Sequence, residues 1–160
     1  MTLRKSSFAA MLTLCICLSD KALAQTESNT MSANETIIRE FIAAWSNLDP
    51  VELVSYFTED GTYNNMPSSA VSGRDNVQNF IAGFIRTWEQ TDWEIISLLA
   101  DGDIVMVERL DKTVVAGKPV NLPCFGIFEM EDGKIKVWRD YFNLPTYVDA
   151  LTAALAPPTN

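Results

Sequence analysis

The sequence predicts an α+β fold in which helices pack on one face of a curved antiparallel sheet. Amphipathic helical patterns dominate the first half of the chain, over residues 33–88. Four strand-like runs follow from residue 93, and short turns that contain glycine join each run to the next. Because helices come first and these strands follow one another directly, the pattern predicts a four-strand meander with helices over one face.

Residues 1–24 have the three parts of a secretory signal. These are a positive start, a short apolar core and a small-x-small cleavage pattern, at Arg4-Lys5, residues 8–18 and Ala22-Leu23-Ala24. We therefore expect cleavage before Gln25 and a periplasmic or secreted protein that is not held in a membrane once mature. An uncleaved membrane anchor is the alternative, although the apolar core is too short to span a bilayer.

The rest of the chain is expected to form one domain over residues 33–156. Residues 25–32 are polar and lack periodicity, which predicts a disordered lead-in. The first helix starts with a capping-box spacing, Ser32-x-x-Glu35. Its apolar stripe at helical spacing consists of Ile37, Ile38, Phe41, Ile42 and Trp45.

Two further helices are predicted before the strands. The second has Asp49 as its cap and Pro50 in its first turn, and its apolar face is Leu53, Val54 and Phe57. A turn at 59–61, an extended piece at 62–66 and a loop at 68–73 should follow. Asp75 is the expected cap of the third helix. Its apolar face is Val77, Phe80, Ile81, Phe84, Ile85 and Trp88.

The second half of the domain is predicted as strands with tight turns. The strands are expected over residues 93–99, 104–115, 120–130 and 135–143. The turns between them are Asp101-Gly102-Asp103, Ala116-Gly117-Lys118 and Glu131-Asp132-Gly133. A short last helix is expected over residues 146–155, after Pro145.

The composition excludes several kinds of chemistry. The chain contains no histidine, which excludes Ser-His-Asp and Cys-His catalysis and histidine-ligated zinc or iron. It contains no Gly-x-Gly-x-x-Gly or other phosphate-binding glycine loop. The net charge of −9 disfavours nucleic acid and anionic membranes as partners. We therefore expect neither a metal nor a cofactor, although a site made of carboxylates alone stays open.

Cys124 is expected to be the one cysteine of the mature chain, because Cys15 and Cys17 belong to the signal. No intramolecular disulfide is therefore expected. The apolar run around Cys124 predicts a small buried core residue, since a nucleophilic thiol needs a histidine or a cationic partner.

Two strand segments carry charged side chains on apolar faces. Strand side chains alternate between faces, so Arg109 and Asp111 share a face with neighbouring valines. By the same alternation, Asp140 shares one with Trp138 and Phe142. Ionised groups on apolar faces are expected to pair, because an unpaired one would shift its pKa or destabilise the fold.

Tyr63 and Asn65 also lie two residues apart in an extended piece and point the same way. If the sheet turns all three segments toward one cavity, the polar groups form a small-molecule site. Asp140 would then take a proton from a water held by Tyr63 and Asn65. Asp111, kept protonated by burial, would donate to a leaving oxygen, and Arg109 would bridge the carboxylates.

Each residue also has a purely structural explanation. Arg109 with Asp111 can be an ordinary ion pair, Tyr63 can cap the core, and Asn65 can be a turn residue. The aromatic neighbours of Asp140 are, taken singly, typical of packing. Only the combination favours a catalytic site.

Five motifs contain these residues or lie near them in the sequence. They are Tyr63-Asn64-Asn65-Met66-Pro67, Gly73-Arg74-Asp75, Glu108-Arg109-Leu110-Asp111, Gly133-Lys134-Ile135 and Trp138-Arg139-Asp140-Tyr141-Phe142. Together they resemble limonene-1,2-epoxide hydrolases over about residues 33–150. The resemblance implies the cone-shaped α+β fold of SnoaL-like and nuclear-transport-factor-like proteins, a homodimer formed through the sheet, and cofactor-free hydrolysis of an epoxide.

The resemblance also implies the role of each polar residue. Asp140 would be the base, Asp111 the acid and Arg109 their bridge, while Tyr63 and Asn65 would orient the water. The residues expected to contact substrate are Leu122, Cys124, Trp138 and Phe142. The loop at 68–72 departs from the family, because it is not rich in proline.

The leading hypothesis is an exported epoxide hydrolase that adds water to a small apolar epoxide in one acid/base step and gives a vicinal diol. An isomerase or cyclase of the same fold, acting on a steroid- or polyketide-like ligand, is one alternative. The water-orienting Tyr63 and Asn65 disfavour it. A non-catalytic small-molecule binding module is the other.

Overall fold

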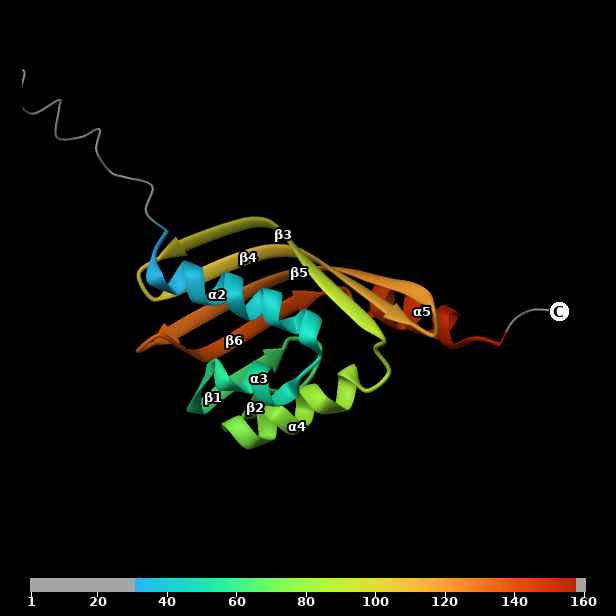
Figure 1. The fold of residues 1–160 in the computed structure, drawn as a ribbon, viewed down its shortest axis with the longest axis horizontal. Helices are drawn as coiled ribbons and strands as arrows, with labels where there is room; N and C mark the ends of the chain where they lie inside the picture. Colours follow the sequence, from blue (N-terminus) through green and yellow to red (C-terminus); the bar gives the residue numbers. More distant parts are fainter. Residues whose placement is uncertain (1–30, 158–160) are drawn as a thin grey trace, which may run out of the picture. The chain divides into compact units, whose positions relative to one another are not determined.

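The structure is a computed structural model that describes residues 31–157. The predicted signal at 1–24 lies outside the described residues. From Ser32 onward the chain forms one unit, in which helices cover a six-stranded curved sheet (Figure 1). The predicted α+β class is therefore confirmed. Within residues 31–157, every helix falls short of the length and hydrophobicity that a membrane span requires.

The first two helices begin where the sequence predicts. Helix α2 (Ala33–Ala44) is capped by the side chain of Ser32, which accepts a hydrogen bond from the Glu35 amide at 3.0 Å. Trp45 extends its buried stripe into a short 3-10 turn, η1 (Trp45–Asn47). Helix α3 (Pro50–Ser55) is capped by Asp49.

The segment between the helices differs from the prediction. Phe57 is buried in strand β1 (Phe57–Asn65) rather than on α3. Residues 59–61 are no turn, because β1 continues through them with a register shift between Phe57 and Thr62. Their acidic side chains point to solvent, where Asp60 binds Lys136 at 2.6 Å, so turn-forming residues fit a strand here.

The loop and the third helix also need correction. The predicted loop at 68–73 contains the short strand β2 (Val71–Ser72), which pairs antiparallel with β1. Helix α4 (Arg74–Ile85) starts after Gly73 and has no side-chain cap. Asp75 lies inside the first turn of α4 and does not cap it. Its negative charge there stabilises the helix through the helix dipole.

The predicted meander is present as β3 (Gln90–Asp101), β4 (Ile104–Val115), β5 (Lys118–Glu131) and β6 (Lys134–Phe142). The sheet order is β2-β1-β6-β5-β4-β3. Strand β1 therefore lies beside β6, and the two run parallel, which the sequence does not predict. This pairing places Asn65 opposite Asp140 and Tyr63 opposite Trp138.

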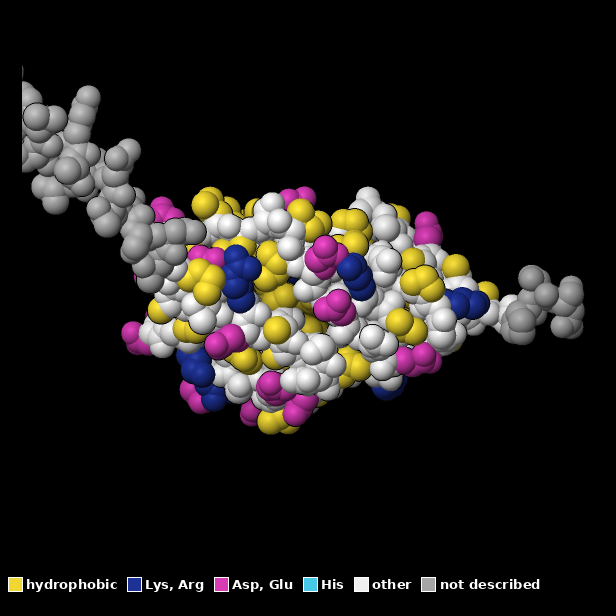
Figure 2. Space-filling view, turned by 45° about the horizontal axis from the view of Figure 1, so that its top comes forward, with side chains coloured by type: hydrophobic (Ala, Val, Ile, Leu, Met, Phe, Trp, Pro, Cys, Tyr) yellow, Lys and Arg dark blue, Asp and Glu magenta, His cyan; other side chains and the backbone are white. Residues whose placement is uncertain are grey.

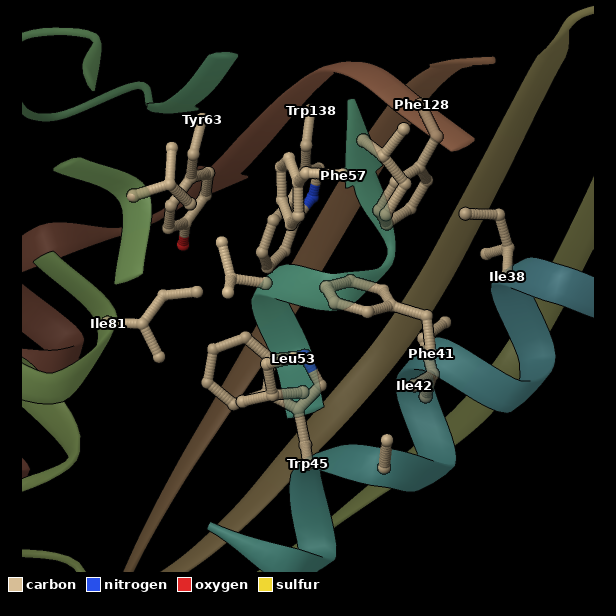
Figure 3. Packing of buried hydrophobic residues seen from close by; sticks show 14 of the residues in the cluster. Ile38, Phe41, Ile42, Trp45, Leu53, Phe57, Tyr63, Ile81, Phe128 and Trp138 are labelled. Atoms are coloured by element: carbon tan, nitrogen blue, oxygen red, sulfur yellow. The ribbon is translucent and has the colours of Figure 1, made fainter. Parts of the chain in front are cut away.

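An aromatic cluster fills the space between the helices and the sheet (Figure 3). Trp138 is at its centre. Its ring stacks on Tyr63 with centroids 4.1 Å apart and on Phe128 at 5.4 Å, and Phe41 meets it edge-on at 5.3 Å. The ring of Tyr63 is therefore held in place by the core itself.

The last helix, α5 (Leu144–Leu155), is capped by Asn143 and carries Pro145 in its first turn. It packs through Ala154 against Val115 and Val120 in a small cluster separate from the main core. The face of the molecule shown in Figure 2 carries scattered acidic side chains and fewer basic ones, in keeping with the net charge of −9.

Candidate active site

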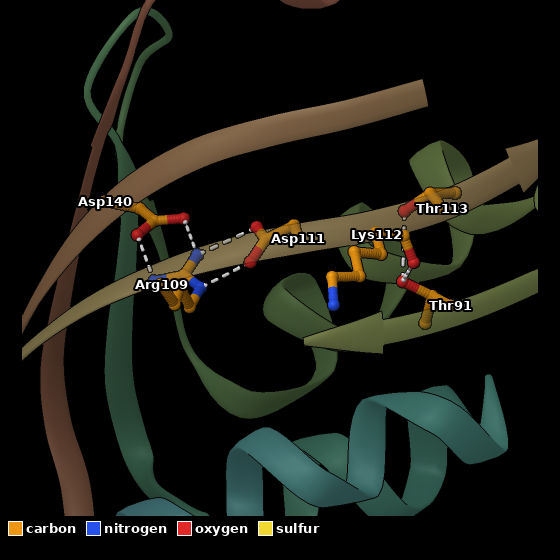
Figure 4. Close-up of polar contacts among 6 residues, drawn as sticks. All are labelled: Thr91, Arg109, Asp111, Lys112, Thr113 and Asp140. Carbon is orange, nitrogen blue, oxygen red and sulfur yellow. Dashed lines mark hydrogen bonds and ion pairs between the residues drawn. The ribbon is translucent and has the colours of Figure 1, made fainter. Parts of the chain in front are cut away.

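The guanidinium of Arg109 binds both aspartates (Figure 4). Its Nε and Nη2 donate to Asp111 at 2.8 and 3.2 Å. Its Nη1 and Nη2 donate to Asp140 at 2.8 and 2.6 Å. Arg109 has no exposed surface, and both carboxylates are buried. The structure thus brings together the three charged residues that the sequence predicts as a group.

A glycine makes this bridge possible. Strand β5 lies between β4 and β6, and its Gly126 is paired with Asp140. A Cβ atom at Gly126 would lie 2.9 Å from Nη1 of Arg109 and 3.2 Å from Nε1 of Trp138. A larger residue would force the guanidinium to shift from its path across β5 toward Asp140. Gly126 was not among the predicted site residues, although a glycine inside a strand is a known sign of close approach.

Two tryptophans surround the guanidinium. Its central carbon lies 4.4 Å from the ring centre of Trp93 and 5.6 Å from that of Trp138, both within the range of a cation–π contact. Trp93 is paired with Asp111 in the sheet. Trp93 was not predicted as a site residue either, because an inward tryptophan on a strand has the same pattern as a core residue.

Burial sets the protonation of the site. Desolvation raises the pKa of Asp111 to about 6; the charge of Asp140 adds to the rise and Arg109 opposes it. Desolvation also raises the pKa of Tyr63 well above its ordinary value, so this phenol stays neutral and can donate. Burial followed by the charge of Asp111 raises the pKa of the Cys124 thiol, so Cys124 is no nucleophile.

A cavity of about 280 Å³ opens beside the two carboxylates. Its walls are mostly apolar and aromatic. The residues that line it are Tyr63, Asn65, Ser68, Phe80, Phe84, Trp88, Trp93, Asp111, Leu122, Cys124, Asp140, Phe142, Leu144 and Tyr147. A small apolar cavity with a few convergent polar groups is typical of a small-molecule site.

The predicted substrate contacts are placed as follows. Leu122, Cys124 and Phe142 line the cavity. Trp138 does not: it has no exposed surface and lies behind Tyr63, so the expectation that it contacts substrate is corrected. Its inward strand position is the same as that of Asp140, but the stacked ring of Tyr63 separates it from the cavity.

Helices supply walls that the sequence analysis left out. They are Phe80 and Phe84 on α4, Trp88 just after it, and Leu144 and Tyr147 on α5. Only the packing of α4 and α5 onto the sheet brings these residues to the site. Their sequence pattern alone is that of ordinary amphipathic helices.

Asn65 has unused hydrogen-bonding capacity. Its Oδ1 is buried and has no partner among residues 31–157, and its Cα is paired with that of Asp140. Buried polar atoms are normally satisfied, and a water is a common partner. An amide and a phenol next to a carboxylate can together hold such a water.

The carboxylates also belong to a group that meets the distance requirement for a metal. Ligand atoms of Asp111, Cys124 and Asp140 lie within 4.8 Å of one another. However, Arg109 already donates a hydrogen bond to each of the four carboxylate oxygens, and the thiol holds its proton. These residues fit proton transfer better than cation binding.

Residues 38–138 match the model of the SnoaL-like domain family. The chain therefore belongs to this family. A protein with ketosteroid isomerase-like fold from Catenulispora acidiphila, solved with trimethylamine, has the same fold. The two agree with a TM-score of 0.66 at 23% identity over 76% of this chain and 97% of that one.

Two of the proteins that are similar to this chain are epoxide hydrolases of Mycobacterium tuberculosis. Epoxide hydrolase EphG is 29% identical over 109 residues, which cover 67% of this chain and 71% of that protein. A solved LEH-like epoxide hydrolase is 25% identical over 77% of this chain and 92% of its own, with a TM-score of 0.66. The resemblance to limonene-1,2-epoxide hydrolases is thus confirmed.

The same fold carries other activities. A candidate SnoaL-like polyketide cyclase from Shewanella putrefaciens has a TM-score of 0.69 at 13% identity, over 78% of this chain and 99% of that one. At this identity the likeness shows the fold alone. The reaction must therefore be argued from the site.

Proposed function

We propose that the protein is an epoxide hydrolase that opens small apolar epoxides to vicinal diols by one-step addition of water. The observation that carries the proposal is the buried Asp111–Arg109–Asp140 bridge at the wall of an apolar cavity. It supplies one proton donor and one proton acceptor a few ångströms apart. Opening a strained ether with water needs both.

The two aspartates take different roles because they share one proton. Two carboxylates about 4 Å apart repel by about 4 kcal/mol at an effective dielectric constant of about 20, so one of them holds a proton more readily than a lone carboxyl does. The raised pKa of Asp111 makes it the acid. Asp140, which faces Asn65 across the β1–β6 pairing, is the base.

In the proposed reaction, Asp140 takes a proton from a water held by Tyr63 and Asn65. The water oxygen forms a bond to one epoxide carbon, and the bond from that carbon to the ring oxygen breaks. Asp111 donates its proton to this oxygen, so the product is a neutral diol. Asp140 then carries the extra proton, which returns to Asp111 through one bridging water, since their oxygens lie within 4.8 Å.

We further propose an exported homodimer. Residues 1–24 support export, through the signal pattern in the sequence. The side of the sheet away from the helices supports a dimer, because large apolar side chains stand exposed on neighbouring strands there. These include Ile96, Met106, Phe125 and Tyr141. Mass spectrometry of the exported protein and its sedimentation in solution test the two statements.

Turnover in ¹⁸O-water tests the reaction. A panel of cyclic and linear epoxides should give diols with one labelled oxygen. Asp140→Asn and Asp111→Asn should each lose about 10²–10⁴-fold in kcat, while Asp92→Asn, an exposed carboxylate on β3, should match the wild type. Normal diol formation by either active-site variant would refute the proposed role of the replaced aspartate as base or acid. An unlabelled, isomerised product from a steroid- or polyketide-like compound would indicate an isomerase or cyclase instead.

A further inference from the structure

We infer that Trp93 is a positioning residue of this site: its indole holds the guanidinium of Arg109 in the orientation that bridges the two aspartates, and it keeps water from one side of that bridge. The expected effects on kcat and KM rest on the proposed function. The placement of the indole against the guanidinium rests on the contacts in the structure alone.

The two faces of the Trp93 ring are both occupied. The guanidinium carbon of Arg109 lies over the ring at 4.4 Å. Trp45 stacks on the same ring with centroids 4.0 Å apart and planes at 14°. Two groups at these distances cannot share one face, so the indole lies between the charge and the core. Trp93 is only 7% exposed, and the stack fixes its tilt.

The stack continues into the helical layer. Trp45 also stacks on Phe84 of α4, with centroids 5.8 Å apart and planes at 20°. The guanidinium therefore rests on a column of rings that runs from the sheet to α4. A cation–π contact is strongest where the charge is desolvated, and Arg109 has no exposed surface. A small aliphatic residue at position 93 would leave that face of the charge without a partner.

Trp93 acts on Asp111 through water exclusion. The charged and titratable groups that face Asp111 are Arg109 on its own strand, Asp140 on β6, Cys124 on β5 and Tyr63 on β1. Trp93 on β3 is uncharged, and burial is the largest cause of the raised pKa of Asp111. Removing the indole should therefore hydrate the carboxyl and lower its pKa, with every neighbouring charge still in place.

The experiment compares Trp93→Leu, Trp93→Phe and Trp88→Leu. Trp88 lines the same cavity, and the cation–π contacts of the guanidinium within residues 31–157 are with Trp93 and Trp138 instead. Trp93→Leu should lose about 10–30-fold in kcat with a small change in KM, the size of a desolvated cation–π contact. Trp93→Phe should recover most of it, because the ring face is restored. Trp88→Leu should change KM alone.

The pH profile separates positioning from packing. A protonated Asp111 is the active form, so kcat/KM should fall as pH rises through its pKa of about 6. Trp93→Leu should move this fall to lower pH, and Trp93→Phe and Trp88→Leu should leave it in place. A Trp93→Leu enzyme with the wild-type kcat and pH profile, or one that behaves as Trp88→Leu does, would overturn the inference.

Two measurements need no turnover. Carbon-13 NMR titration of the Asp111 carboxyl should show a lower pKa in Trp93→Leu, and the Nε proton of Arg109 should show a ring-current shift that this variant loses. If Trp93→Leu does not fold, the wild-type ring-current shift decides, and its absence would refute the stack. If no epoxide of the panel is hydrolysed, the proposed hydrolase activity is refuted and the role of Trp93 is not. If the Asp111 titration and the Arg109 ring-current shift are the same in Trp93→Leu as in the wild type, the role of Trp93 is refuted and the hydrolase activity is not.

Discussion

Replacing Asp111 with asparagine should stabilise the fold at neutral pH, although it removes the proposed acid. The carboxyl has an ordinary pKa of 3.8 and a pKa of about 6 in the folded protein. The folded state therefore binds this proton more tightly than the unfolded chain does. The associated stability is full below pH 3.8 and is lost as pH rises to about 6. The loss amounts to about 3 kcal/mol, at 1.36 kcal/mol per pH unit.

Asparagine resembles the protonated carboxyl in size and charge, so Asp111→Asn should avoid this loss. The assay is urea unfolding of wild type and variant between pH 4 and pH 8. The difference in free energy of unfolding should be near zero at pH 4 and should approach about 3 kcal/mol in favour of the variant at pH 8. Groups that do not interact with Asp111 cancel in this difference, and Asp92→Asn serves as the exposed control.

The result depends on which of two opposing effects is larger. Burial raises the pKa of Asp111, and Arg109, at 2.8 Å from its Oδ1, lowers it. If the ion pair prevailed, the carboxylate would be stabilised and Asp111→Asn would lose stability as pH rises. That outcome would refute the assignment of Asp111 as the protonated member of the pair.

Three other substitutions test the site. Gly126→Ala places a Cβ 2.9 Å from Nη1 of Arg109. It should lower the free energy of unfolding by about 1–3 kcal/mol and also lower kcat. A wild-type melting curve with full activity would contradict the close approach of the guanidinium to Gly126. Arg109→Lys should lower kcat at least about 100-fold, because one ammonium cannot reproduce four hydrogen bonds to two carboxylates; a smaller loss in steady-state assays would argue against the bridge. Cys124→Ser should keep kcat within about threefold of the wild type, because the buried thiol holds its proton and takes no part in bond formation. Inactivation of the native enzyme by iodoacetamide at pH 8, or loss of turnover in the variant, would show that the thiol is reactive.

Local rules determine most of the helices and strands of this domain. Ser32 and Asp49 cap their helices as predicted, because a cap is made by neighbours in the sequence. The alternation along β4 places Arg109 and Asp111 on one face, and the structure shows both buried there. Capping and alternation depend on residues a few positions apart, which is why the sequence alone reveals them.

Contacts between distant segments were out of reach of the sequence. The parallel pairing of β1 with β6 brings Asn65 opposite Asp140, and neither strand specifies it, since any two strands with apolar faces can pair. For the same reason Phe57 and Trp138 were misplaced: their apolar patterns fit a helix face and a cavity wall as well as the core.

Residue order alone reveals which side chains carry charge on buried faces, and with them the kind of chemistry the site can perform. The folded arrangement of the strands sets how those charges are balanced. It gave the guanidinium a gap at Gly126 and a ring beneath it at Trp93, from strands well separated along the chain. Burial and distance set a pKa, and both arise only when the chain has folded.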